Sequence, residues 1–394
     1  MHRDFERLVG TDPDELLRLR FSRLKSVEIC EKLLHEKCVK KGVSLDEATL
    51  REKSKGLSSA VDSGLNYWRI KEESLNTRVL SRYYALLQFT IAEEVASVDN
   101  NMDLKEAQKH TERGHGLSTL RKYTDNDFLE NYFCYFRTDG HLHHYLQQIG
   151  FQKNEDFFVA KRLKMEDDLG GISVVSLLDL FRRIPELQNV VEEYTGKCPL
   201  VLNIGLDSMR EHEKKELRRE KYSKESGTFQ FFAPEETDAE VTTYVSIYPT
   251  SENMTPEYVE SLQTPFSNFR LAEDSPTRSE YIACDFRHAN EGLWWNSIKT
   301  YKSSYSATSY IVPLFGKIDD PVVINYCLMY TLSIIVRYLP DIWYEITAGA
   351  MNNIGSLIDY YISVFDHTIL LQMLQRITGK RVHVTSPGSL DAPI

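Results

Sequence analysis

The clearest candidates for a binding site are two arginines and one histidine. Arg78 and Arg82 are four residues apart, so a helix would place both on one face. His115 lies between two glycines, which let the backbone turn sharply there. The planar fork of an arginine donates paired hydrogen bonds to a phosphate. One interpretation is therefore a binding site for a phosphate or a nucleotide.

The same residues also have a structural interpretation, which we favour. In it, Arg82 ties its helix to a loop carbonyl or carboxylate, and His115 caps the helix. The sequence alone leaves both interpretations open.

Three histidines, His141, His143 and His144, follow a Thr-Asp-Gly turn. A helix would place His141 and His144 on one face, where two imidazoles can bind a metal. No third ligand is adjacent, so we predict no metal site. Arg137 precedes these histidines and forms, with His144, a weak candidate for a catalytic pair.

A second arginine–histidine pair, Arg287 and His288, precedes the adjacent tryptophans Trp294 and Trp295. Arginine beside aromatic rings is one way to hold a nucleic-acid base. Adjacent tryptophans are also common in a core or an interface. Arg287 and His288 are thus candidate ligand-binding residues with a packing alternative.

Composition and missing motifs exclude several classes of protein. The net charge of −11 argues against a protein coated with positive charge for nucleic acid, although a local basic patch is compatible with it. Six cysteines without a CxxC pair are typical of reduced thiols, and the polar N-terminus has no apolar signal segment, so we expect a cytoplasmic protein. There is no Walker A, GxGxxG, HExxH or GxSxG motif, and we predict no cofactor.

The N-terminal part is predicted to be helical. Asp12 and Pro13 begin a helix that continues to about Cys38, because aspartate is a common N-cap and proline suits the first turn. Residues 41–65 give weaker signals of a short helix and a loop. Residues 78–96 form a central helix with one stripe of apolar residues at helical spacing.

The C-terminal part is helical again. Residues 322–338 are apolar nearly all round but shorter than the roughly 20 residues of a membrane span, which indicates a helix buried in a core. Arg337 and Tyr338, together with Trp343, are interpreted as an anchor at its end. An amphipathic helix follows at 353–377 and stops at Gly379.

Strand signals dominate the middle of the chain, where β-branched and aromatic runs are separated by Pro, Asn, Asp and Ser. A densely charged helix is predicted at 207–225. The predicted strands lie at 128–136, 200–204, 228–232, 239–248, 279–286 and 306–314.

These elements predict an α+β fold, with a helical core built from both ends of the chain and a mixed sheet-and-helix region inserted between them. The apolar helix needs partners on every side, and the N-terminal helices can supply them. The expected parts are an N-terminal helical part at 1–125, the inserted α/β region at 126–315, C-terminal helices at 316–379 and a loose tail at 380–394.

Three stretches resemble the YaaC-like protein family of bacteria. Residues 81–86 read SRYYAL, and residues 114–118 read GHGLS. Residues 310–314 read YIVPL and are followed at 332–343 by LSIIVRYLPDIW, the most specific block. The stretches reach both ends of the chain, so the resemblance spans most of it. The family is largely uncharacterised and therefore implies little chemistry.

A looser resemblance is to the HEPN superfamily of helical-bundle proteins, carried by Arg-Tyr-Tyr in a helix and a later Gly-His-Gly-Leu loop. It implies a ribonuclease with an arginine and a histidine on one helix. Arg137 and His144 have suitable spacing, but the Thr-Asp-Gly turn between them breaks a helix.

Two functions remain as hypotheses. The leading one is a bacterial cytoplasmic binding or scaffold subunit that acts with a protein partner or as a homo-oligomer, in anti-phage defence. The alternative is an enzyme directed at RNA or a nucleotide, with Arg78, Arg82 and His115 at its site.

Overall fold

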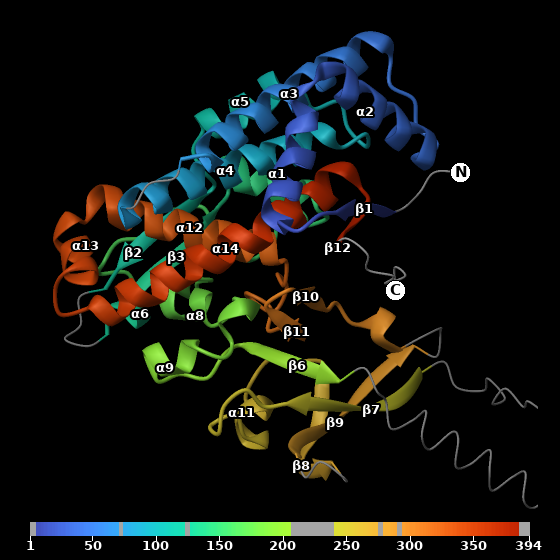
Figure 1. Ribbon diagram of the computed structural model, residues 1–394. Helices are drawn as coiled ribbons and strands as arrows, with labels where there is room; N and C mark the ends of the chain where they lie inside the picture. The colour runs from blue at the N-terminus through green and yellow to red at the C-terminus, as the bar shows by residue number, and fades with distance from the viewer. Residues whose placement is uncertain are drawn as a thin grey trace, which may run out of the picture. The chain divides into compact units, whose positions relative to one another are not determined.

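The structure contains both helices and sheets and is an α+β fold, as predicted (Figure 1). The computed structural model describes residues 5–70, 74–122, 127–205, 240–274, 279–289 and 294–385. The helix predicted at 207–225 and the strand at 228–232 lie outside these ranges. Contacts divide the chain into two compact units. Unit 1 joins Met1–Leu177 to Asn325–Ile394, and unit 2 is Leu178–Ile324.

The first predicted helix is broken into three pieces. α1 (Pro13–Ser22) begins as predicted, since Oδ1 of Asp12 accepts a 3.0 Å hydrogen bond from a backbone N–H of the first turn. The 3₁₀ turn η1 (Arg23–Lys25) follows, and then α2 (Val27–Lys41). The prediction of one continuous helix is wrong because Ser26 adopts an extended conformation and caps α2 with its side chain.

The helix α3 (Glu47–Trp68) is longer than the short helix predicted for this region. The predicted loop is wrong because its small residues serve close helix packing. A Cβ atom on Gly64 would lie 2.4 Å from Cε1 of Phe89, which belongs to α4 (Leu75–Ala96). Glycine there lets two long helices approach each other.

Helices from the two ends of the chain form one helical core, as predicted. α4 is confirmed as a central helix, and it is buried on more than one stripe. α12 (Pro321–Tyr338) is confirmed as a core helix, since 72% of it is buried. Tyr326 and Tyr330 of α12 pack edge-on against Tyr83 of α4, with 5.9 Å between ring centroids in each pair.

The two chain ends also meet in a small sheet. α13 (Pro340–Thr347) leads to α14 (Asn352–Thr378), which ends at Gly379 in a left-handed conformation, as predicted. β12 (Arg381–Thr385) then pairs in parallel with β1 (Phe5–Val9). The expectation of a loose tail is wrong for β12, because its backbone gains hydrogen bonds from the N-terminal strand.

A second sheet of unit 1 is organised around β3 (Tyr132–Arg137), which runs antiparallel to β2 (Leu117–Arg121) and β5 (Val175–Ser176) and parallel to β4 (Phe158–Val159). The strand predicted from residue 128 starts late because a turn of helix precedes it. The short helices of this part are α5 (Leu104–Glu112), α6 (Phe128–Asn131) and α7 (His141–Gln148). α8 (Leu177–Phe181) begins at the last residue of this segment and continues into unit 2.

Unit 2 contains a six-stranded sheet in the order β10-β11-β6-β7-β9-β8, with every pairing antiparallel. One face carries an apolar core that includes Leu202, Ile247 and Phe286. The strands are β6 (Val201–Gly205), β7 (Glu240–Tyr248), β8 (Phe266–Asp274), β9 (Ser279–Ala289), β10 (Tyr301–Ser303) and β11 (Ser306–Ile311). The helical turns are η2 (Pro185–Leu187), α9 (Val191–Thr195), α11 (Pro256–Glu260) and η3 (Trp294–Ser297).

Candidate functional site

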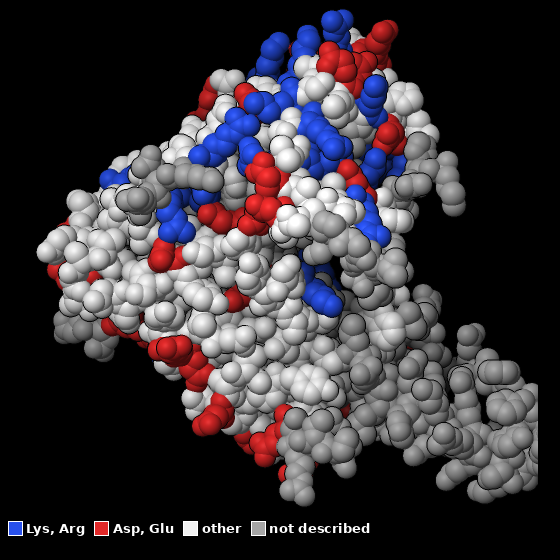
Figure 2. All heavy atoms as spheres, viewed as in Figure 1, with Lys and Arg blue, Asp and Glu red and all other residues white. Residues whose placement is uncertain are grey.

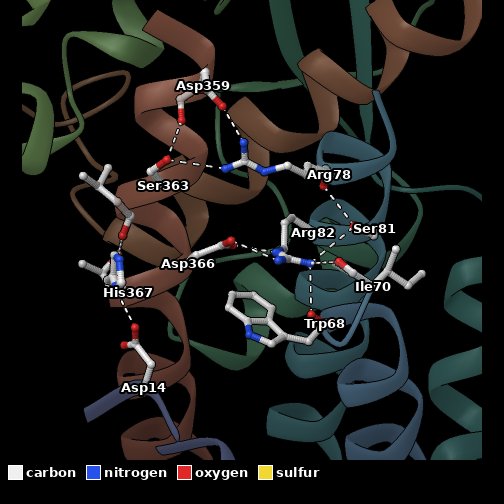
Figure 3. Close-up of polar contacts among 12 residues, drawn as sticks. Asp14, Trp68, Ile70, Arg78, Ser81, Arg82, Asp359, Ser363, Asp366 and His367 are labelled. Atoms are coloured by element: carbon white, nitrogen blue, oxygen red, sulfur yellow. Dashed lines mark hydrogen bonds and ion pairs between the residues drawn. The ribbon is translucent and has the colours of Figure 1, made fainter. Parts of the chain in front are cut away.

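Arg78 and Arg82 both extend from α4 toward α14, where each meets an aspartate (Figure 3). Nη1 of Arg78 lies 2.5 Å from Oδ1 of Asp359, and its Nη2 lies 3.4 Å from the hydroxyl of Ser363. Asp359 and Ser363 are one helical turn apart on α14. Because the side chain of Asp359 is 59% exposed, this ion pair is at the edge of the helix interface.

Arg82 is held more completely than Arg78. Its Nε and Nη2 donate to the two carboxylate oxygens of Asp366 at 2.6 and 3.0 Å, a bidentate arrangement. Its Nη1 donates to the carbonyls of Trp68 and Ile70 at 3.1 and 3.2 Å. The guanidinium carbon also lies 4.8 Å from the centre of the Trp68 ring. These contacts match the structural interpretation, in which Arg82 ties its helix to a carboxylate and to loop carbonyls.

Polar contacts continue to the ends of the two helices. Nε of Arg376 on α14 lies 2.9 Å from Glu93 on α4. The three ion pairs between these helices follow the same order along both, from Arg78–Asp359 through Arg82–Asp366 to Glu93–Arg376. α4 and α14 therefore run parallel. The ammonium group of Lys37 donates to the carbonyls of Ala96 and Ile377, each at 2.8 Å. A cation at this place balances the partial negative charge at the C-terminal ends of both helices.

His115 contacts α4 through the hydroxyl of Tyr83, which lies 2.8 Å from its Nδ1. Tyr83 is inside the helix, so the expectation that His115 caps α4 is wrong. The loop can turn here because Gly116 has a φ of 78°, and a Cβ there would lie 2.6 Å from the backbone nitrogen of Leu142. Burial and the guanidinium of Arg337 lower the pKa of His115, so its imidazole is neutral near pH 7. The described contacts of Arg78 and Arg82 are with α14 and the α3–α4 connection, so the predicted trio is not assembled as one group.

Arg337, near the end of α12, lies in the same surroundings as His115. Its Nε and Nη2 donate to the carbonyl and hydroxyl of Ser333 at 3.0 and 3.1 Å, and its Nη1 donates to the hydroxyl of Tyr84 at 3.3 Å. The guanidinium carbon lies 5.2 Å from the ring centre of Tyr338. The sequence interpretation as a helix-end anchor covers the Ser333 contacts but misses the link to α4 and His115. One sequence signal pointed to this difference. The residues three and four positions before Arg337 are Ile334 and Ser333, so Arg337 has no acid one turn earlier with which to form a salt bridge.

Among the histidines, His141 belongs to the buried core. Its Nε2 lies 2.9 Å from the hydroxyl of Thr90, and its Nδ1 lies 3.3 Å from a carboxyl oxygen of Glu94. Burial lowers the pKa of His141 to about 3 and raises the pKa of Glu94 well above its usual value. His141 begins α7 and Glu94 lies in the last turn of α4, and both helix ends disfavour the charged forms. The pair is therefore neutral.

His143 and His144 lie beside His110 of α5. The rings of His110 and His144 stack with centroids 3.5 Å apart, and Nε2 of His143 lies 2.6 Å from the side-chain amide of Gln147. Burial lowers the pKa of His144 to about 4. In the part of the chain that the structure describes, no group of three metal-binding His, Cys, Asp or Glu residues is present.

Arg137 and His144 lie on different elements, so they do not form the arginine–histidine pair of a single helix. Arg137 ends β3, and its backbone N–H donates to the carbonyl of Gly116 at 3.0 Å. His144 lies in α7, which begins only after Gly140 takes a φ of 91°. The turn between them separates strand from helix.

The candidates of unit 2 lie at the end of β9. Arg287 is exposed and forms an ion pair with Glu240 at 2.5 Å. His288 is buried, with Nε2 lying 2.8 Å from the hydroxyl of Thr243 and Nδ1 2.7 Å from the carbonyl of Ala289. Neighbouring residues of a strand point to opposite faces of the sheet, so these two side chains do not converge.

Comparison with known proteins places the chain in a family. No curated protein and no solved structure matches it. The HEPN-like resemblance is not shown by these comparisons. The model of the YaaC-like protein family matches residues 22–377, which include α4, the His115 loop, α12 and nearly all of α14. The chain therefore belongs to the YaaC-like protein family.

Proposed function

We propose that this YaaC-like protein is a binding or scaffold protein of the bacterial cytoplasm, and that it acts with a protein partner. The observation that carries the proposal is a set of exposed tyrosines on the C-terminal helices of unit 1. Tyr338 of α12 is 65% exposed, Tyr344 of α13 is 62% exposed and Tyr360 of α14 is 40% exposed. Tyrosine is enriched in protein–protein interfaces and often dominates their binding energy.

The distribution of charge supports the same proposal. Figure 2 shows Lys and Arg side chains gathered over the N-terminal helices, interleaved with acids, whereas the area over α13 and α14 on this face is mostly uncharged. The centres of protein interfaces are depleted of charged residues in the same way. Helices that carry exposed tyrosines and few charges suit a protein partner better than a polyanion.

The contacts of Arg78 and Arg82 weigh against the enzyme alternative. An arginine that stabilises a reacting phosphate must present its N–H groups to the substrate. Here the guanidinium of Arg82 is bound to an aspartate and two carbonyls, and that of Arg78 to Asp359. The ion pairs and hydrogen bonds of both arginines instead stabilise the packing of α4 against α14.

Cross-linking on the exposed tyrosine surface tests the proposal. The wild type, a Tyr344→Ser/Tyr360→Ser variant and a Leu271→Ser control are expressed in cells, cross-linked and purified. Leu271 is 57% exposed on unit 2, so the control removes an apolar side chain of similar exposure elsewhere. We expect cross-links from α13 or α14 to one defined protein, retained in the control and lost in the double variant. Equal cross-linking by all three proteins contradicts the proposal.

Light scattering of the purified protein decides whether that partner is a second copy of the chain. A dimer that the double variant turns into a monomer identifies a homo-oligomer. Phage infection of cells with and without the protein tests the defence role that we propose for it. Equal plaque counts contradict that role and leave the partner-binding proposal standing.

A direct assay tests the ribonuclease alternative. Labelled RNA is incubated with the wild type and with His115→Ala and His144→Ala variants. Cleavage by the wild type that either variant abolishes would overturn the scaffold proposal. We expect no cleavage above that of a buffer control.

A further inference from the structure

Arg337 carries a positive charge that its described surroundings do not neutralise. Its partners are the carbonyl and hydroxyl of Ser333 and the hydroxyl of Tyr84, all of them uncharged. No described carboxylate forms an ion pair with it, in contrast to Arg78, Arg82 and Arg376. A guanidinium has five N–H donors, and these contacts use one hydrogen on each nitrogen. The position favours an anion from outside the protein.

His115 adds a second donor to the same place. Nδ1 of His115 lies 2.8 Å from the hydroxyl of Tyr83, and in the tautomer in which this hydroxyl donates, the hydrogen of the neutral imidazole is on Nε2. The charge of Arg337 reaches His115, Tyr83 and Tyr330, each of which it perturbs electrostatically. Contacts also connect the two groups, because Arg337 of α12 bonds to Tyr84, the ring centre of Tyr84 lies 5.3 Å from that of Tyr83, and Tyr83 contacts His115 of the loop before β2.

Aromatic rings flank this region. Tyr67 of α3 stacks on Tyr84 with 5.4 Å between ring centroids and is 38% exposed. Tyr338, whose ring centre lies 5.2 Å from the guanidinium carbon of Arg337, is 65% exposed. Exposed tyrosine rings are platforms on which nucleic-acid bases stack. The region thus combines donors for a phosphate with surfaces for a base.

We propose that Arg337 and His115 bind the phosphate of a nucleoside monophosphate, and that Tyr338 stacks on its base. The net charge of −11 opposes a long polyanion, so the ligand is a free nucleotide or the phosphorylated end of a short strand. The inference goes beyond the proposed partner binding, which rests on the exposed tyrosines of α12, α13 and α14 together and is tested at Tyr344 and Tyr360.

Calorimetric titration with AMP, GMP, CMP and UMP tests the site, with adenosine and inorganic phosphate as partial ligands. We expect at least one nucleotide to bind more tightly than either partial ligand. Arg337→Gln should weaken binding about 10- to 100-fold, because it removes charged hydrogen bonds. Tyr338→Ser should weaken nucleotide binding about fivefold or more and leave phosphate binding unchanged. Titration with a 5′-phosphorylated tetranucleotide distinguishes a strand end from a free nucleotide.

Arg78→Gln is the matched control. It also removes an arginine from unit 1, but this arginine is already paired with Asp359. It should bind nucleotide as the wild type does. Because Arg337→Gln could disturb the end of α12, circular dichroism of each variant accompanies the titrations, and Tyr338→Ser tests the site at an exposed position. Three results overturn the inference: no nucleotide binding by the wild type at millimolar concentration, equal binding by Arg337→Gln that is folded, or equal binding of adenosine and AMP. The Tyr344→Ser/Tyr360→Ser variant should still bind nucleotide, which separates this inference from partner binding.

Discussion

Arg82 and Arg337 lie in the same helical core but have opposite surroundings. Arg82 has a bidentate aspartate, two carbonyls and a tryptophan ring. Arg337 has hydroxyls, one carbonyl and a tyrosine ring. A buried guanidinium beside an acid joins two helices, whereas one beside neutral oxygens keeps its net charge. Residue type alone does not separate these roles, because the charge of the partner decides.

The largest expected effect is on folding stability at Arg82. Arg82→Ala leaves Asp366 and two carbonyls without their donor, and we expect it to lower the free energy of unfolding by about 3–5 kcal/mol. Urea denaturation followed by circular dichroism measures the change.

Arg78→Ala is the control within the same pair of helices. Its partner Asp359 is largely exposed, so the loss should be at most about 1 kcal/mol. A loss at Arg82 no greater than that at Arg78 would show that the contacts of the buried pair do not stabilise the core.

The second prediction concerns the loss of folding stability in acid that the low pKa of His144 causes. The pKa of His144 is about 4 in the folded protein, below the value of about 6.5 in an unfolded chain. Between pH 6.5 and 4 the unfolded chain therefore binds the extra proton, and stability falls as the pH falls, by up to about 1.4 kcal/mol per pH unit. Urea denaturation at a series of pH values should give a flatter profile for His144→Asn. Parallel profiles would contradict the low pKa.

A smaller effect is expected when Arg337 is replaced. Arg337→Gln loses hydrogen bonds to Ser333 and Tyr84 but also removes a charge that lacks an acid partner. We expect the free energy of unfolding to fall by about 1 kcal/mol, which is the value of an ordinary hydrogen bond. A loss as large as that of Arg82→Ala, measured in the same urea experiment, would indicate that Arg337 has a structural role like that of Arg82.

The smallest expected effect is on the pKa of His115, and it distinguishes Arg337 from Arg78. The charge of Arg337 helps to lower the pKa of His115. In Arg337→Gln the pKa of His115 should therefore rise, whereas Arg78→Gln should leave it unchanged. Titration of the His115 ring signals by NMR measures both. An unchanged pKa in Arg337→Gln would mean that the two groups do not share a site.

The sequence predicted the ends of helices correctly where a capping residue, a proline or a glycine stands at the end. Asp12 and Pro13 locate the start of α1, and Gly379 locates the end of α14. The predictions failed where tertiary packing decides. Gly64 suggests a loop in the sequence, but it exists because Phe89 passes close to it.

The candidate site was predictable only in part, for the same reason. The spacing of Arg78 and Arg82 correctly indicates one helix face, but their aspartates are about 280 residues away in the sequence. Arg337 is linked to Tyr84 across 253 residues. A single sequence does not contain the pairing of α4 with α12 and α14, so it could not show which arginine is neutralised.

The pairing of β1 with β12, together with the bonds of Lys37, has a consequence for biosynthesis. Unit 1 needs segments from both ends of the chain, so its core is incomplete until α14 and β12 have left the ribosome. Unit 2 is one continuous segment, and all of it emerges earlier. Because domains fold as units during synthesis, we expect unit 2 to fold first, and α4 to wait for the helix that neutralises its arginines.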